Sequence, residues 1–190
     1  MIAEDNKNRS VGLLTMHRVT NCGSQLQAYA LQRVVNALGY DCKVIDYEYP
    51  SLFHYSRKMD KGNLKSVKGV IKKILNALGL LRLVQGVNIW RFNLQVRRQM
   101  REGFQGVKLT RAYNISSIKR HPPRFDIYLI GSDQVWNPDC IVGDYTFLLD
   151  FAPECVGRVA YSASFGAREL PKEHNDEYAR LLRRFSAIGV

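Results

Sequence analysis

The sequence has 190 residues and a formal net charge of +11, and a chain of this length fits a single domain with a sizeable core. Hydrophobic residues make up 46% and charged residues 24% of the chain, as in an ordinary globular protein. A run of about 18 apolar residues, the length of a membrane-spanning helix, does not occur, and the first ten residues are too polar for a signal peptide. We therefore expect a cytoplasmic protein.

Cysteine and histidine spacing argues against a metal site. The four cysteines, Cys22, Cys42, Cys140 and Cys155, are widely scattered and form no C-x-x-C pair. The histidines have no ligand spacing either. We expect reduced thiols and no bound metal ion.

The N-terminal part of the chain predicts a βαβ unit. Residues 11–16 form a short apolar run, and residues 24–38 carry apolar side chains at helical spacing before a stop at Gly39. Residues 42–47 read as the second strand. This succession implies a parallel sheet with a right-handed crossover.

The middle of the chain is strongly basic. Residues 51–124 contain 17 Lys and Arg but only two acids, Asp60 and Glu102. Two amphipathic helices are expected here, over about 64–81 and 87–104, as a helical insertion or a long crossover. Three interpretations of the basic face stay open: binding to an anionic membrane surface, packing on the domain, or attraction of an anionic polymer.

The last third predicts further strands of the same sheet. Residues 126–131 are almost continuously hydrophobic, as in strands that are covered on both faces. A strand over 158–166, a helix over 172–185 and a strand over 187–190 follow. We expect an α/β fold, a Rossmann-like parallel sheet flanked by helices.

Polar side chains follow three of these strands. Because ligands bind outside the carboxyl ends of strands in open parallel sheets, we expect one cleft there. Hydroxyl and amide groups suit the hydroxyls of a sugar, and the tryptophan could stack on a sugar face. The residues expected to line the cleft are Asn21, Gly23, Ser24, Gln25, Ser132, Asp133, Gln134, Trp136, Asn137, Ser164 and Gly166.

Several of these residues have two readings. The helix that opens at Gly23 and Ser24 could bind a phosphate or carboxylate, or Asn21 or Ser24 could simply cap it. Asp133 is the best candidate for an acid or base, and it could equally cap the following turn. Asp46 imitates the acid of a dinucleotide site, but the preceding turn has one glycine instead of G-x-G-x-x-G, which argues against such a cofactor.

At these residues the sequence resembles the polysaccharide pyruvyl transferase family. The similar blocks are, in chain order, GLLTMHRVTNCGSQLQAYALQRVVNALGY, VIDY, FDIYLIGSDQVWNP, GDYTFLLDF and RVAYSASFG. They cover most of the chain outside the basic segment. The G-S-D-Q-x-W-N block followed by A-S-F-G is the most specific part. Cys22 departs from the family, in which an aromatic residue is common at this position.

The resemblance implies a pyruvyl transfer from phosphoenolpyruvate to sugar hydroxyls of a bacterial cell-surface polysaccharide or its precursor, without another cofactor. It also implies two Rossmann-like lobes, as in glycosyltransferase-B enzymes, of which residues 1–190 would be the first, with an insertion at about 51–124. The second lobe, expected to supply the general acid, would be absent from this chain. Asp133 would be the base.

The sequence is also compatible with other function classes. The chain could be a non-catalytic sugar-binding or scaffolding lobe, or a glycosyltransferase-like enzyme. Nucleic-acid binding is disfavoured, because aromatic and basic residues are not interleaved and no nucleic-acid motif occurs. The expected partner is a glycan or a lipid-linked sugar, and the enzyme could lie at the inner face of the cell membrane through its basic segment.

Overall fold

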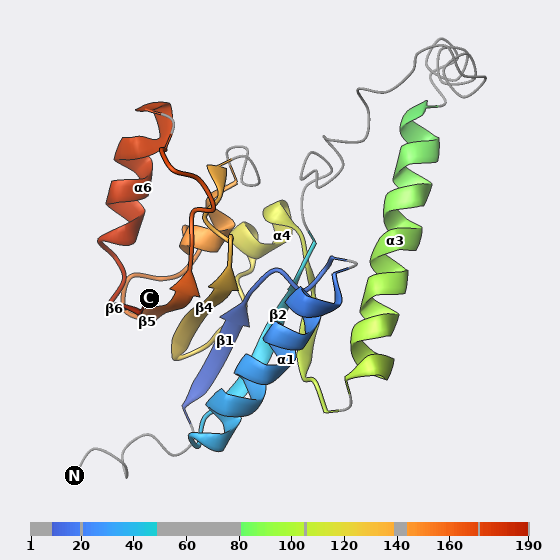
Figure 1. The fold of residues 1–190 in the computed structure, drawn as a ribbon, viewed down its shortest axis with the longest axis horizontal. Helices are drawn as coiled ribbons and strands as arrows, with labels where there is room; N and C mark the ends of the chain where they lie inside the picture. The colour runs from blue at the N-terminus through green and yellow to red at the C-terminus, as the bar shows by residue number, and fades with distance from the viewer. Residues whose placement is uncertain are drawn as a thin grey trace.

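The chain folds into an α/β domain around a six-stranded parallel sheet (Figure 1). The computed structural model describes residues 9–19, 21–48, 81–104, 106–138, 144–170 and 172–189. The strands are β1 (Ser10–Leu14), β2 (Asp41–Tyr47), β3 (Leu109–Tyr113), β4 (Ile127–Asp133), β5 (Gly157–Ala163) and β6 (Ala187–Gly189). The helices are α1 (Cys22–Ala37), α3 (Leu81–Gly103), α4 (Ile115–Arg120) and α6 (Asn175–Leu182), with short 3-10 helices η2 (Tyr145–Leu148) and η3 (Lys172–His174).

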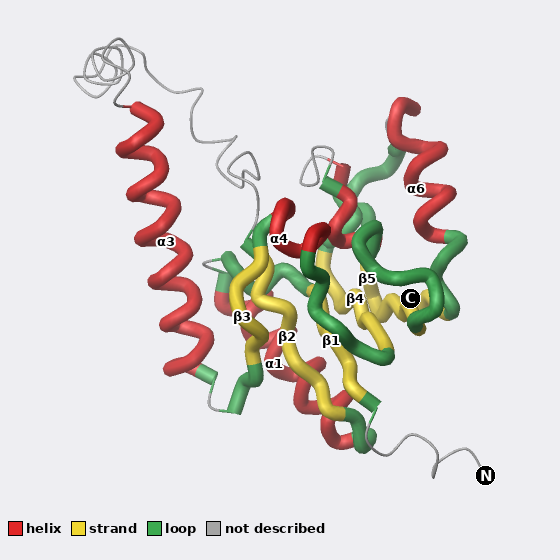
Figure 2. Tube along the Cα trace, turned by 180° about the vertical axis from the view of Figure 1, so that it is seen from behind, coloured by secondary structure: helices red, strands yellow, loops and turns green. Residues whose placement is uncertain are grey.

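Neighbouring residues of each strand enter two different cores. Side chains alternate between the faces of a sheet, so Leu13 joins the core under α1 while Leu14 joins the core on the opposite face. The opposite face carries α4, η2 and α6, and its core includes Ile118, Phe147 and Tyr178. Figure 2, seen from behind, shows the strands in front of α1. Both faces of the central strands are thus covered, which explains why they read as continuous apolar runs.

The strand order is β3-β2-β1-β4-β5-β6, and all neighbours are parallel. The chain builds outward from β1 in one direction and from β4 in the other. In doubly wound sheets the crevice between two such strands, at their carboxyl ends, is where ligands bind. The fold therefore places a natural site beyond the ends of β1 and β4.

Gly131 lets α1 pack closely on β4. A methyl group on this residue would lie 2.2 Å from Leu31 Cδ2 of α1 and 3.0 Å from Leu13 Cδ1 of β1. Only glycine leaves room for the helix at this distance. Because Gly131 lies two residues before the end of β4, this contact brings the start of α1 near the carboxyl end of that strand.

Most of the expected elements are confirmed, with shifted ends, but the basic segment is not purely helical. It contains a strand, β3, and the short helix α4, neither of which was expected. β3 lies at the edge of the sheet, and most of its residues are partly exposed, so it lacks the apolar run of the central strands. The expected helix over about 64–81 lies outside the described residues except for Leu81, where α3 begins.

No helix within the described part of the chain combines the length and the apolar character that crossing a membrane requires.

Candidate functional site

Three strand ends meet at the carboxyl edge of the sheet. Ser24 Oγ, at the start of α1, donates a hydrogen bond of 2.9 Å to Asp133 Oδ2 at the end of β4. The Ser164 backbone N–H, after β5, donates to the Asp133 carbonyl at 3.0 Å. The backbone N–H of Trp136 donates to the Ser164 carbonyl at 3.1 Å. The prediction that the three polar segments converge is confirmed.

Asp133 is held in an unusual backbone conformation. Its φ of 85° lies in the left-handed region, which residues other than glycine rarely adopt. Such a conformation costs about 1–3 kcal/mol and persists only where the surroundings enforce it. Here the Ser164 backbone N–H bonds to the Asp133 carbonyl and the Ser24 hydroxyl bonds to its carboxylate, so two neighbouring segments hold the same residue. The strained conformation fixes where its carboxylate points.

The carboxylate of Asp133 keeps free hydrogen-bonding capacity. Oδ2 accepts from Ser24, and Oδ1 accepts from the Gln134 N–H at 2.8 Å. A carboxylate offers about four lone-pair sites, so two remain for a substrate hydroxyl. The side chain is partly exposed. Chemically, this oriented carboxylate can accept a proton from a hydroxyl that approaches the edge of the sheet.

The rim next to Asp133 is made of amides. Asn137 Nδ2 donates to Gln134 Oε1 at 3.2 Å. Gly166 has a φ of 59°, and a Cβ on it would lie 2.4 Å from Gln134 Cδ, so only glycine lets the two loops approach this closely. The Gln134 side chain is exposed and its N–H₂ group has no protein partner among the described residues. This pair offers both donors and acceptors to a polar ligand.

Of the site residues expected at the start of α1, Ser24 contacts Asp133, whereas Asn21 and Gln25 hold the helix and the loop before it in place. Asn21 Oδ1 accepts from the Gly23 N–H at 2.8 Å, so Asn21 is the helix cap. Ser24 does not cap the helix, because its hydroxyl bonds to Asp133 instead. Gln25 is fully buried, and its amide donates to the Val19 carbonyl at 2.9 Å. Gln25 thus holds the loop before α1 from the buried side. Ser132, on β4, is also buried.

Trp136 lies in the core, and its expected role in stacking on a sugar is wrong for this structure. The side chain is only 3% exposed. Its indole N–H donates to the Phe147 carbonyl at 3.0 Å, and its ring packs against Phe165 and Phe185, with centroids 5.5 and 5.9 Å away. Because these contacts cover the ring, Trp136 anchors the loop after β4 and has no face to offer to a ligand.

A buried ionic cluster lies beside the site, at the ends of β1 and β2. Asp46 Oδ1 accepts from Arg18 Nε at 2.6 Å and lies 3.2 Å from His17 Nε2, while Arg97 Nε of α3 lies 3.0 Å from Oδ2. His17, Arg18 and Asp46 are at most 2% exposed. Burial alone would raise the pKa of Asp46, but the hydrogen bonds from His17 and Arg18 and the charge of Arg18 outweigh it and hold this pKa far below its usual range.

The ionic cluster was missed by the sequence reasoning. Its one signal is that His17 and Arg18 follow β1 while Asp46 lies near the end of the adjacent β2, so parallel pairing brings them together. The sequence pattern compares Asp46 only with the acid of a dinucleotide site, which the missing glycines argue against. In the structure both of its carboxylate oxygens are engaged by basic side chains. The cluster ties α3 to the sheet, and Arg18 also lies 3.4 Å from Glu48.

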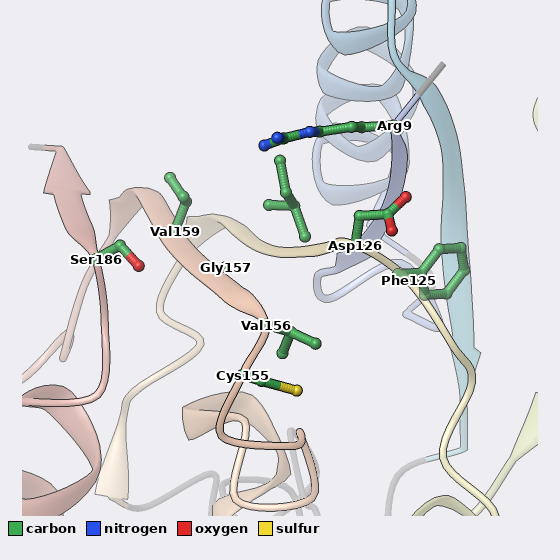
Figure 3. A pocket seen from close by; sticks show the side chains of 9 residues that line it. Arg9, Phe125, Asp126, Cys155, Val156, Gly157, Val159 and Ser186 are labelled. Carbon is green, nitrogen blue, oxygen red and sulfur yellow. The ribbon is translucent and has the colours of Figure 1, made fainter. Parts of the chain in front are cut away.

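A cavity of about 480 Å³ lies at the amino ends of the strands, opposite the carboxyl ends where Asp133 lies (Figure 3). It is lined by residues that precede or begin β1, β4, β5 and β6, among them Arg9, Asp126, Gly157 and Ser186. Ligands of parallel sheets bind at the carboxyl ends, and none of the expected site residues reaches this cavity. We therefore assign the candidate site to the carboxyl edge.

The described residues contain no group of three or more His, Cys, Asp or Glu side chains arranged to hold a metal ion.

Comparison with known proteins gives one match. The family model described as polysaccharide pyruvyl transferase matches residues 21–190, which include α1 and the ends of β4 and β5. No curated protein and no solved structure matches the chain.

Proposed function

Because the chain belongs to the polysaccharide pyruvyl transferase family, we propose that it takes part in transferring a pyruvyl group from phosphoenolpyruvate to hydroxyls of a sugar in a cell-surface polysaccharide or its precursor. The observation that carries the assignment of the site is the hydrogen bond from Ser24, at the start of α1, to Asp133, at the end of β4. It places an oriented carboxylate at the point of the fold where ligands bind.

The chemistry that this function requires begins on the donor. A general acid protonates the methylene carbon of phosphoenolpyruvate, and the adjacent carbon becomes an oxocarbenium centre. A sugar hydroxyl loses its proton to a base as its oxygen attacks that carbon. The C–O bond to phosphate then breaks, phosphate leaves with the electron pair, and a second hydroxyl of the sugar attacks the same carbon. Loss of the second proton yields the cyclic ketal.

In this scheme Asp133 is the base for the attacking hydroxyl. Its two unoccupied lone-pair sites can receive the hydroxyl, and the bonds from Ser24 and the Gln134 N–H hold the carboxylate in place. Ser24 is thus a positioning residue for the base. General-base catalysis of this kind contributes about 10²–10⁴-fold to a rate.

The remaining site residues bind or position the sugar. Gln134 and Asn137 present amides at the rim, and Ser164 and Gly166 shape the adjoining loop. Asn21, Gly23, Gln25 and Ser132 support the start of α1 and the end of β4 from behind. In this proposal Trp136 acts only through the loop that it anchors.

The donor side of the site belongs to a second lobe. In the proposed architecture this sheet is the first of two Rossmann-like lobes, as in glycosyltransferase-B enzymes, and the reacting groups meet between them. The general acid and the cations that hold phosphate and carboxylate come from that second lobe. Charge stabilisation in such a closed cleft is often the largest catalytic contribution. The reaction uses phosphoenolpyruvate as donor and no further cofactor, in the cytoplasm.

Phosphate release tests the proposed reaction. The full-length protein is incubated with phosphoenolpyruvate and a library of glycan acceptors, and inorganic phosphate and the mass of the glycan are measured. We expect phosphate release only with a suitable acceptor, together with the mass gain of a pyruvyl ketal. Glycan binding without phosphate release would instead show a sugar-binding lobe without catalysis. Transfer from a nucleotide sugar would show a glycosyltransferase.

A further inference from the structure

Helix α3 exposes a face on which apolar and cationic side chains mix. Val87, Trp90 and Leu94 are 54%, 62% and 48% exposed, and the arginines around them are exposed as well. These residues are three or four positions apart, so they lie within an arc of about 100° on a helix of 3.6 residues per turn. We call this set the Trp90 face: Val87, Trp90, Arg91, Leu94, Arg98 and Arg101.

The other side of α3 fixes the direction of the Trp90 face. Val96 and Met100, on that side, are fully buried. Arg97 follows Trp90 by seven residues, so it lies at the border of the Trp90 face, and its long side chain reaches Asp46 of the sheet. Tyr29 of α1 packs against Phe104 just after the helix, with ring centroids 5.5 Å apart. In both views α3 stands beside the β3 edge of the sheet (Figures 1 and 2). The Trp90 face therefore points away from the domain.

The charge on this face is largely uncompensated. Among the described residues Arg91 and Arg101 have no acidic partner, and Arg98 pairs only with the exposed Glu102 at 2.8 Å. The sequence of residues 51–80 adds seven Lys and Arg and one acid. Because that segment is itself cationic, its charge would repel the arginines of the Trp90 face. An occupant that complements the face must be anionic and must also accept apolar side chains.

We propose that the Trp90 face binds an anionic lipid surface. Tryptophan and leucine on one side of a basic helix insert at the boundary between headgroups and acyl chains, while arginines reach the lipid phosphates. A soluble polyanion would pair with the arginines but would leave Val87, Trp90 and Leu94 in water, so lipid is the better fit. This proposal does not depend on the proposed reaction.

Vesicle flotation of the full-length protein tests the proposal. One set of vesicles contains phosphatidylcholine alone, and the other contains equal parts of phosphatidylcholine and phosphatidylglycerol. We expect flotation only with the anionic set. Arg91→Glu with Arg98→Glu, and separately Trp90→Ser with Leu94→Ser, should each lower the partition coefficient by at least about tenfold. Because all four side chains are exposed, the variants should keep the wild-type unfolding midpoint.

A matched control separates the helix face from overall charge. Arg33→Glu with Arg124→Glu changes the net charge by the same amount at exposed sites outside α3 and should float like wild type. Tryptophan emission adds an independent readout, since Trp136 is buried and a blue shift on anionic vesicles therefore reports Trp90. Trp90→Phe should abolish that shift.

Three results would overturn the proposal. One is equal flotation with neutral and anionic vesicles. Another is unchanged flotation of both face variants, which would place the contact elsewhere in the basic segment. The last is binding to soluble polyphosphate that falls with the arginine variant, combined with full flotation of Trp90→Ser with Leu94→Ser. That outcome would show an anionic polymer as the partner.

Discussion

Helices α1 and α3 use their apolar side chains in opposite ways. α1 lies along the sheet, buries Ala28 and Val35 against the strands, and meets β4 so closely that a methyl group on Gly131 would clash with Leu31. α3 is longer, and in its second half Val96 and Met100 are fully buried. Its first half leaves a tryptophan exposed.

The difference teaches which parts of the chain are constrained by packing. Around α1 every change in volume is felt, because the helix, β1 and β4 interlock next to the candidate site. Val87, Trp90 and Leu94 of α3 are instead exposed and can contact an external partner. The chain's two tryptophans report on these two environments separately, because Trp136 lies in the core and Trp90 on the outward face.

The largest expected effect on stability is a contrast between the two tryptophans, one near each helix environment. Trp136→Ala should lower the free energy of unfolding by about 3–5 kcal/mol, because a buried aromatic is replaced by a cavity. Trp90→Ala should change it by less than about 0.5 kcal/mol, as exposed positions do. Urea denaturation of both variants measures this contrast. Similar losses for the two would show that the Trp90 face is covered in the folded protein.

The ionic cluster that joins α3 to the sheet should come next. Asp46→Asn removes the buried carboxylate that pairs with Arg18 and Arg97 and should cost about 3 kcal/mol of unfolding free energy. Asp41→Asn is the matched control: Asp41 pairs with Lys108 at 2.8 Å on the surface, so its loss should cost under about 1 kcal/mol. Equal effects of the two substitutions would contradict the assigned role of the cluster.

The pH dependence of the Asp46 effect has a definite sign. The folded-state pKa of Asp46 lies below its unfolded value, which is about 3.9. Its stabilisation is therefore complete above that value and is lost as the pH falls through the folded pKa. The difference in unfolding free energy between wild type and Asp46→Asn should stay constant from neutral pH to about pH 5 and shrink below about pH 4. A difference that grows in acid would refute this sign.

A smaller effect is expected where α1 crosses β4. Gly131→Ala places a methyl group 2.2 Å from the end of the Leu31 side chain, which can shift only partly. We expect a loss of about 1–2 kcal/mol from overpacking. Gly103→Ala at the end of α3 meets no atom within 4 Å and should be neutral or slightly stabilising. The midpoints of thermal unfolding of the two variants show the effect of one added methyl group at each helix.

The sequence predicted the central sheet because its strands are buried on both faces and read as apolar runs. It also predicted that the segments after β1, β4 and β5 converge, since parallel strands end at one edge. β3 was missed because an edge strand such as Leu109–Tyr113 mixes polar and apolar residues and lacks such a run.

Other features could not be predicted because they depend on partners far away in the chain. Trp136 turns into the core only because Phe165 and Phe185 close over it. Arg18 and Arg97 meet Asp46 only after β2 and α3 are in place. The left-handed conformation of Asp133 likewise results from hydrogen bonds to α1 and the β5 end.

The central claim is that Asp133 at the carboxyl edge is the base of the transfer. Its most direct test is the rate of acceptor-dependent phosphate release from phosphoenolpyruvate by full-length Asp133→Asn and Asn21→Ala proteins, each checked for unchanged unfolding. The account predicts that Asp133→Asn lowers kcat by about 10²–10⁴-fold, while Asn21→Ala, which removes only a helix cap, changes it far less. A loss under about tenfold in a folded Asp133→Asn protein would contradict the account.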